Sequence, residues 1–274
     1  MKIGIVGGTG RMGRFFADVF DRAGYEVAVA GRRTPRSARH LAAECDIVMV
    51  SVPIRQTVQV IREIAPLLAE GQLFCDLTSL KTDPVNAMLE SAAEVIGLHP
   101  MFGPTVTGLR GQTIIATPAR CTDESLSRFL GIFEREGGRI TVTTPEEHDR
   151  MMAIVQGLTH FVTLSVAETM RRAGIDPRDT TPFTSPVYQI ELGLVGRLLA
   201  QDHSLYADIL QLNPFVPEIL AHCEKSVHTL RTVVGSGDPD EFRSVFLANA
   251  GHFGTCTERG MKMTDELIQH MVSR

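Results

Sequence analysis

A glycine-rich segment near the start of the chain has the spacing of a phosphate-binding turn. Gly8-Thr9-Gly10-Arg11-Met12-Gly13 fits GxGxxG, and it lies between the apolar run Ile3–Val6 and a helical pattern. In such a strand–turn–helix the glycines permit a tight turn, backbone approach to a pyrophosphate and close packing of helix on strand. The helix N-terminus then faces the phosphates. We therefore predict a dinucleotide-binding site whose cofactor ligands are Gly8, Thr9, Gly10, Arg11, Met12 and Gly13.

The residues after the second apolar run, Val27–Ala30, bear on which dinucleotide binds. An NAD-binding domain usually places Asp or Glu there to hold the ribose hydroxyls. This chain has Gly31-Arg32-Arg33 instead. Two guanidinium groups can pair with a 2′-phosphate, and no acid repels it. The sequence therefore favours NADP over NAD. The alternative is that Arg32 and Arg33 simply lie on a solvated surface.

Polar residues also follow the next strands of the predicted sheet. Ligands of open parallel sheets bind beyond the carboxyl ends of the strands, so Ser51, Val52 and Pro53 are expected at the cofactor. His99 follows a later strand, where it could take a proton from a substrate hydroxyl. A lone histidine is more often structural than catalytic, and the residues alone leave both interpretations open.

Alternating strands and helices must position these residues. Continuous apolar strands separated by helices predict a parallel sheet covered on both faces, a Rossmann-type α/β domain. A strand usual in that fold is missing between Ala30 and Ile47. The predicted strands are Ile3–Val6, Val27–Ala30, Ile47–Val52, Leu73–Leu77, Val95–Leu98 and Thr113–Ala116, and the predicted helices are Arg11–Ala23, Pro35–Ala43, Thr57–Leu68, Pro84–Glu90 and Asp123–Glu136.

The pattern changes at Thr144-Pro145-Glu146-Glu147, a capping box with proline at the first helical position. Apolar residues then recur at helical spacing to Gly174, and further helices are predicted at about 186–201, 203–211, 214–234 and 239–272. No strand pattern follows residue 145. We therefore predict a dinucleotide-binding domain at 1–145 and an all-α domain at 146–274. The long apolar stretches of the second domain favour a homodimer through it.

Composition argues against several other classes of protein. The net charge of −5 gives no footprint for nucleic acid or an anionic membrane. The five cysteines are never spaced CxxC and no HExxH occurs, so we expect reduced thiols and no metal site. No signal-peptide pattern is present, and no apolar run reaches the roughly 18 residues that span a bilayer. The expected location is the cytoplasm.

Longer motifs run through both halves of the chain. They are D-L-T-S-L-K at 76–81, G-L-H-P-M-F-G-P at 97–104, E-H-D-R-M-M-A at 147–153, Q-G-L-T-H-F at 156–161 and S-P-V-Y-Q-I-E-L-G-L-V-G-R-L-L-A-Q-D at 185–202. Together they resemble the prephenate dehydrogenases of tyrosine biosynthesis. The last motif looks most like the dehydrogenase part of the bacterial enzymes fused to chorismate mutase.

The resemblance implies a role for each matching residue. His99 would accept the proton of the substrate's C4 hydroxyl, and Ser79 would contact that histidine or the nicotinamide. Lys81 would lie near a substrate carboxylate, Arg197 would bind the ring carboxylate, and His160 would line the same cleft. The implied reaction is oxidative decarboxylation of prephenate to 4-hydroxyphenylpyruvate, with hydride transfer to NAD(P).

One departure from the family concerns the substrate. The mutase-fused enzymes have a second arginine eight residues before the counterpart of Arg197, and this chain has Gln189 there. The loss of a cation would suit an amino-bearing relative of prephenate, namely arogenate or 4-amino-4-deoxyprephenate. All three substrates therefore stay open.

Two other classes of protein fit the sequence less well. A β-hydroxyacid dehydrogenase needs a lysine on the first helix of its second domain, and no lysine occurs between Lys81 and Lys225. A non-catalytic NADP sensor would have no reason to keep together four residues in their expected places, namely His99, Ser79, Lys81 and Arg197.

Overall fold

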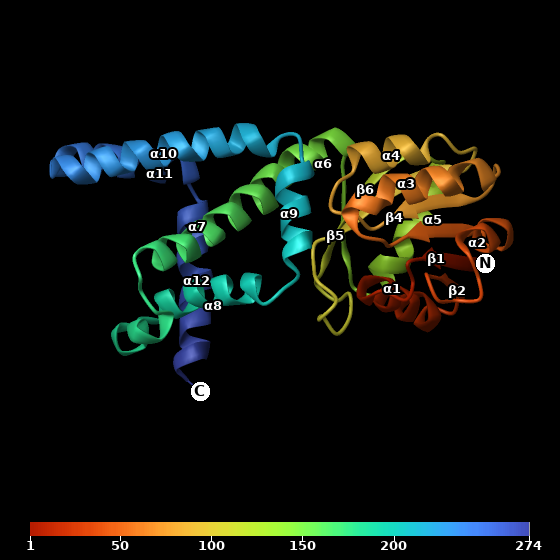
Figure 1. Ribbon diagram of the computed structural model, residues 1–274, viewed down its shortest axis with the longest axis horizontal. Coiled ribbons are helices and arrows are strands. Elements are labelled where there is room, and N and C mark those ends of the chain that lie inside the picture. The colour runs from red at the N-terminus through yellow and green to blue at the C-terminus, as the bar shows by residue number, and fades with distance from the viewer. Residues whose placement is uncertain (274) are drawn as a thin grey trace. The chain divides into compact units, whose positions relative to one another are not determined.

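The computed structural model describes residues 1–273, and its first part is built on a seven-stranded sheet in the order β2-β1-β3-β4-β5-β6-β7 (Figure 1). Strands β1 to β5 are parallel, which confirms the predicted Rossmann-type sheet. β6 is antiparallel to β5 because no helical crossover lies between them, and β7, which was not predicted, is parallel to β6. The strands are β1 (Lys2–Val6), β2 (Glu26–Ala30), β3 (Ile47–Val50), β4 (Leu73–Asp76), β5 (Glu94–Pro100), β6 (Thr113–Arg120) and β7 (Arg139–Val142).

Helices cover both faces of the sheet and form two cores. α1 (Arg11–Arg22) and α5 (Asp123–Arg135) place four phenylalanines against one face, where Phe16, Phe20, Phe129 and Phe133 are buried with Ile47 and Met49 of β3. α2 (Ala38–Glu44), α3 (Ile54–Ile64) and α4 (Thr82–Met88) cover the other face, which receives Val48 and Val50. Successive strand residues point to opposite faces, so each apolar strand feeds both cores. The single helix α2 joins β2 to β3, in agreement with the predicted missing strand.

The first helix after the sheet starts as the capping box predicts. Thr144 caps α6 (Pro145–Met152) by accepting a hydrogen bond from the Glu147 N–H. A π-helical turn, Ala153–Leu158, then leads into α7 (Thr159–Arg172).

The chain divides into two compact units inside this long helix. The first unit is Met1–Ala153 with Ala207–Pro214, and the second is Ile154–Tyr206 with Phe215–Arg274. The boundary predicted at 145–146 falls at the start of α6, whereas the structure keeps α6 with the sheet.

Within the residues described, the second unit contains only helices. α7 contacts α8, α12 contacts α8, and α10 contacts α11. Gly254, with φ +49°, separates α11 from α12, so the stretch predicted as one helix over 239–272 is two. Its longer helices are α8 (Pro186–Leu199), α9 (His203–Leu212), which ends in the first unit, α10 (Val216–Ser236), α11 (Pro239–Phe253) and α12 (Cys256–Val272).

Large apolar side chains of the second unit are exposed in a single chain. α7, α11 and α12 bury no residue fully. Phe183 is 87% exposed, and Phe246 and Phe253 are each 62% exposed. A monomer in water rarely leaves so much apolar surface uncovered.

One helix, Pro145–Arg172, is long and apolar enough to cross a membrane by length and composition. The expectation that no stretch reaches this length was therefore wrong. The polar residues His148 and Asp149 near its start are nevertheless buried against the sheet unit, where both are hydrogen bonded. This end of the helix is packed on protein.

Candidate active site

A buried ion pair lies at the carboxyl end of β4. The Lys81 ammonium donates to both carboxylate oxygens of Asp76, at 2.6 and 2.5 Å, and to the Leu98 carbonyl at 2.7 Å. Both charged side chains are fully buried. Burial raises the pKa of Asp76 and lowers that of Lys81, while their mutual attraction opposes both shifts.

The expected role of Lys81 at a substrate carboxylate does not agree with this geometry. All three N–H donors of the ammonium are already used inside the protein. The buried carboxylate of Asp76 requires a cation beside it, because an uncompensated buried charge is strongly unfavourable. In this structure the Lys81 ammonium is a buried cation bonded to Asp76 and to the carbonyl of Leu98, the residue before His99.

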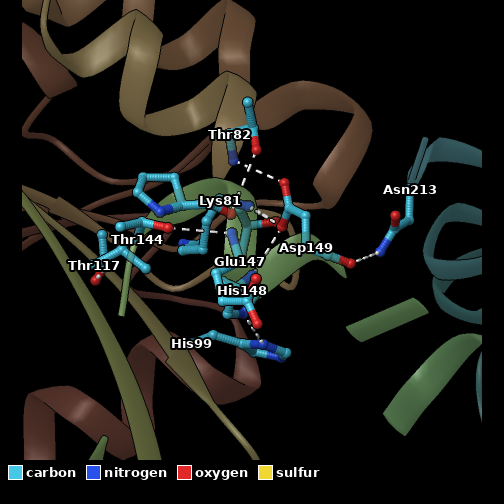
Figure 2. Close-up of polar contacts among 12 residues, drawn as sticks. Lys81, Thr82, His99, Thr117, Thr144, Glu147, His148, Asp149 and Asn213 are labelled. Carbon is cyan, nitrogen blue, oxygen red and sulfur yellow. Dashed lines mark hydrogen bonds and ion pairs between the residues drawn. The ribbon is translucent and has the colours of Figure 1, made fainter. Parts of the chain in front are cut away.

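His99 forms one end of a chain of buried polar groups (Figure 2). Its Nδ1 is 2.9 Å from Nε2 of His148 on α6, and Nδ1 of His148 is 2.8 Å from a carboxylate oxygen of Asp149. His99 is 2% exposed, His148 1% and Asp149 2%. The three side chains therefore form a continuous imidazole–imidazole–carboxylate chain.

The carboxylate of Asp149 also organises the loop after β4. Its two oxygens accept hydrogen bonds from the backbone N–H of Lys81 at 2.8 Å and of Thr82 at 2.9 Å. Its backbone carbonyl accepts a hydrogen bond of 2.7 Å from the side-chain amide of Asn213, which returns to this unit from α9. Figure 2 shows Asp149 between these groups. One residue thereby holds α6 against the start of α4.

The environment favours neutral imidazoles beside an ionised carboxylate. Burial, His148 and Lys81 together hold the pKa of His99 well below its ordinary value. Burial also lowers the pKa of His148, and outweighs the hydrogen bond to Asp149, which raises it. Burial raises the pKa of Asp149, but the hydrogen bonds from His148, Thr82 and Lys81 outweigh it and the net pKa is lowered. A neutral His99 can act as a proton acceptor at neutral pH.

The predicted cofactor turn has the close approaches that its glycines imply. Gly7 has φ +84°, and a Cβ there would lie 2.1 Å from the Ser51 carbonyl oxygen. A Cβ on Gly13 would lie 2.5 Å from the Gly7 carbonyl oxygen, so α1 packs directly on the turn. No side chain caps the N-terminus of α1 and no acidic residue lies in its first turn. These features fit the pyrophosphate of a dinucleotide.

At the end of β2, Gly31 lies against the side chain of Thr9. A Cβ on Gly31 would lie 2.6 Å from Oγ1 of Thr9, so the threonine fills that space. The Thr34 hydroxyl closes the following turn by bonding the backbone of Gly31 and the Arg36 carbonyl. Arg32 and Arg33 are exposed on this turn.

Ser51, Val52 and Pro53 occupy the corresponding turn after β3. The Ser51 N–H donates to the Val6 carbonyl of β1, and Pro53 precedes the first residue of α3. Ser51 and Val52 are partly exposed.

The residues between β4 and α4 include two hydroxyl side chains. Ser79 is half-buried. Thr78 Oγ1 is a buried side-chain atom for which no hydrogen-bond partner is present in the described residues.

The remaining predicted residues belong to the second unit. The rings of His160 on α7 and Tyr206 are 4.9 Å apart in an edge-to-face contact, and Arg197 on α8 lies close enough to Tyr206 to influence its ionisation. Burial lowers the pKa of His160. Gln189 and Arg197 are exposed on α8, about two turns apart. The structure thus brings His160 and Arg197 to one residue, Tyr206.

Sequence reasoning missed the residues that support His99. His148 and Asp149 lie in the E-H-D segment, but neighbours in a helix do not normally face one another, so the pattern gave no reason to pair them. Asn213 lies more than 60 residues farther along the chain. The apolar signal of β4 and β5 predicted the strands but not which polar groups the fold would bury beside them.

Comparison with known proteins identifies the family to which the chain belongs. A model of the prephenate dehydrogenase nucleotide-binding domain matches residues 23–142, and a model of the prephenate dehydrogenase dimerization domain matches residues 144–248. The chain belongs to the prephenate dehydrogenase family. It therefore has the two domains of an NAD(P)-dependent dehydrogenase, a nucleotide-binding domain and a helical dimerization domain.

Individual relatives align over nearly the whole chain. A probable arogenate/prephenate dehydrogenase of Methanocaldococcus jannaschii is 34% identical over 292 residues, an alignment that covers 100% of this chain and 66% of that protein. A T-protein of Haemophilus influenzae is 33% identical over 272 residues, covering 98% and 71%. The chain thus spans about two thirds of the length of these relatives.

The fold also matches a solved structure of the family. Prephenate dehydrogenase from Aquifex aeolicus, solved with hydroxyphenyl propionate and NAD+, has a TM-score of 0.70 and 22% identity, over 92% of this chain and 97% of that one. At this identity the match shows the shared fold.

The structural role of Lys81 predicts a stability effect. Lys81→Met should lower the free energy of unfolding by about 3–5 kcal/mol, because the Asp76 carboxylate is left buried without its cation. Adding Asp76→Asn should recover most of that loss, since the amide oxygen can still accept from the Thr78 N–H. Urea unfolding followed by circular dichroism measures both variants.

Lys2→Met is the control for removal of a lysine from an ion pair at the protein surface, and it should change stability little. If Lys81→Met were as stable as the wild type and only raised the KM for substrate, the ammonium would belong at a substrate carboxylate after all.

Proposed function

We propose that this protein catalyses the oxidative decarboxylation of prephenate to 4-hydroxyphenylpyruvate, with hydride transfer to NAD(P). The observation that carries the proposal is the buried His99, whose pKa is depressed, at the carboxyl end of β5 in a dinucleotide-binding sheet. Ligands of such sheets bind at that edge. A base there is suited to a hydroxyl whose carbon loses a hydride.

Different residues of this chain would accept the substrate proton and bind the substrate carboxylates. His99 would accept the C4 hydroxyl proton while the nicotinamide, when bound, takes the hydride. Arg197 would pair with a substrate carboxylate, and His160 would line the substrate site beside it. Ser79 would orient His99 or the nicotinamide. Aromatisation of the ring drives the loss of carbon dioxide, so positioning and proton transfer are what the protein must supply.

The choice of substrate depends on few residues, and Gln189 is one of them. Where the mutase-fused enzymes have a second arginine, the neutral Gln189 reduces the positive charge on the exposed surface of α8. Arogenate or 4-amino-4-deoxyprephenate, each with its own ammonium, is therefore the alternative substrate. The M. jannaschii relative is named a probable arogenate/prephenate dehydrogenase, which includes both substrates.

The first experiment offers prephenate, arogenate and 4-amino-4-deoxyprephenate to the wild-type chain, each with NAD and with NADP, and follows absorbance at 340 nm. We expect turnover with prephenate and a loss of at least about 10²-fold in kcat for His99→Asn, which removes the base. Because the pKa of His99 is depressed, kcat/KM should hold as the pH falls below about 6.5 and decline only through the lower pKa. Turnover confined to an amino-bearing substrate would make Gln189 the specificity residue, and silence in all six assays would refute the proposed activity.

We propose NADP as the preferred cofactor. The support is the exposed Arg32-Arg33 turn after β2, together with Gly31 where an NAD-binding domain usually has an acid. A guanidinium pairs well with a phosphate dianion. NAD lacks that phosphate and would gain nothing from these arginines.

Replacing both arginines should therefore change the cofactor preference. Arg32→Gln/Arg33→Gln should raise the KM for NADP at least about tenfold and leave the KM for NAD nearly unchanged, because only the 2′-phosphate contact is lost. Arg39→Gln, an exposed arginine on α2, is the matched control. Equal changes for NAD and NADP would place the two arginines away from the 2′-phosphate.

We also propose that the protein works as a cytoplasmic homodimer joined through its helical domain. The matching dimerization-domain model and the exposed apolar side chains of α7, α11 and α12 support this assembly. A second copy would cover those side chains, including the apolar part of the helix that is long enough to cross a membrane.

Light scattering on the detergent-free protein tests this assembly. The mass should be twice that of one chain across micromolar concentrations, because burial of this much apolar surface makes dissociation costly. A monomer at every concentration would contradict the dimer, and a protein that needs detergent to stay in solution would contradict the cytoplasmic location.

A further inference from the structure

The hydrogen bonds that join His99, His148 and Asp149 can be assigned a donor and an acceptor at each step, and the proposed function does not use this order. Asp149 is ionised and can only accept hydrogen bonds, so Nδ1 of His148, 2.8 Å away, must carry the proton between them. A neutral His148 then has a bare Nε2, which accepts from Nδ1–H of His99 at 2.9 Å. The proton on His99 is thereby fixed on Nδ1.

We infer that His148 and Asp149 are positioning residues that hold His99 with Nε2 as its basic nitrogen and that take over its second proton during the reaction. The inference deepens the proposed function and rests on it. His148 and Asp149 touch neither substrate nor cofactor in this scheme; they act through His99.

Each proton that moves in this scheme passes between the substrate, His99 and His148. The substrate O–H bond breaks as an N–H bond forms at His99 Nε2, and the Nδ1–H proton of His99 passes to Nε2 of His148. His99 is then neutral again, and His148 is an imidazolium paired with Asp149. When the ring becomes aromatic, the proton on Nε2 of His148 returns to Nδ1 of His99. The proton on Nε2 of His99 then passes to the phenolate oxygen of the product.

The surroundings favour this direction of transfer. Among the described residues, His148 of α6 and Lys81 of the loop before α4 lower the pKa of His99, whereas Lys81 lowers and Asp149 and Asp76 raise that of His148. Both carboxylates raise the pKa of His148, and Nδ1 of His148 lies 2.8 Å from the Asp149 carboxylate, which would stabilise an imidazolium there. An extra proton is therefore more stable on His148, next to Asp149, than on His99.

Four hydrogen bonds, including the one from His148, hold Asp149 in place. Backbone N–H groups of Lys81 and Thr82 fix its carboxylate, and Asn213 fixes its carbonyl. The carboxylate cannot rotate away from His148 without losing these bonds. Wrong-tautomer histidines are costly in general, since loss of the orienting carboxylate in an analogous carboxylate–histidine base lowers kcat by about 10⁴.

A tautomer measurement tests the arrangement without any turnover. Nitrogen-15 NMR of the full-length protein, labelled at histidine, should show His99 and His148 both protonated on Nδ1 at neutral pH. Spectra of His99→Asn and His148→Gln assign the two signals. In His148→Leu, which offers no acceptor, His99 should lose its fixed Nδ1–H state. In His148→Gln, whose side-chain oxygen can accept from Nδ1–H, that state should persist.

Kinetics of the same variants separate positioning from proton transfer. His148→Leu should lower kcat by about 10²-fold or more with a smaller change in KM, because the base loses both its tautomer and its proton acceptor. His148→Gln should recover part of kcat but not all of it, since glutamine cannot take up the proton. Glu146→Gln, exposed on the same helix, is the control and should match the wild type.

Each contrary result bears on a different claim. An active wild type with His99 protonated on Nε2, or a His148→Leu variant with wild-type kcat, overturns the relay. Full wild-type kcat in His148→Gln overturns the proton transfer and leaves only positioning. Inactivity on every substrate despite the expected tautomers refutes the proposed function, and with it the use of the relay in that reaction.

Discussion

The arrangement around His99 depends on one carboxylate, that of Asp149. It lies in the second turn of α6 and satisfies two backbone N–H groups at the start of α4, while its other contact orients His148. A buried carboxylate is stable only when several donors surround it. Here those donors come from segments more than 60 residues apart, so the requirement to satisfy one charge joins the loop after β4 to the first helix beyond the sheet. The position of His99 relative to His148 follows from that junction.

A second buried charge acts on the same loop from the other side. Lys81 neutralises Asp76 and holds the carbonyl of Leu98, the residue before His99. Its backbone N–H simultaneously bonds Asp149. Lys81 therefore links the two carboxylates, one through its side chain and one through its backbone. The buried Lys81 also contributes to the low pKa of His99, so the group that stabilises the loop helps to keep the base neutral.

Sequence reasoning succeeded where a local pattern is enough and failed where distant groups meet. Apolar runs predicted β1 to β6 because a strand buried on both faces is apolar throughout. The short β7 (Arg139–Val142) was missed because it is mostly exposed and carries no such run. The glycine turn was predictable since its chemistry is contiguous in sequence. Lys81 was assigned by family resemblance to the substrate, but the partner that decides its role is Asp76, and nothing in the sequence states that both would be fully buried.

The groups that the proposed function uses in the two units differ in burial. In the sheet unit, burial, His148 and the Lys81 cation depress the pKa of His99, the proposed proton acceptor. Under the proposed function Arg197 on α8 of the helical unit pairs with a substrate carboxylate; its side chain is exposed, and a guanidinium stays protonated at any physiological pH. The proposed function thus assigns proton acceptance to a buried, neutral group and anion binding to an exposed, charged one, and the substitution at Gln189 changes the charge of the helical unit alone.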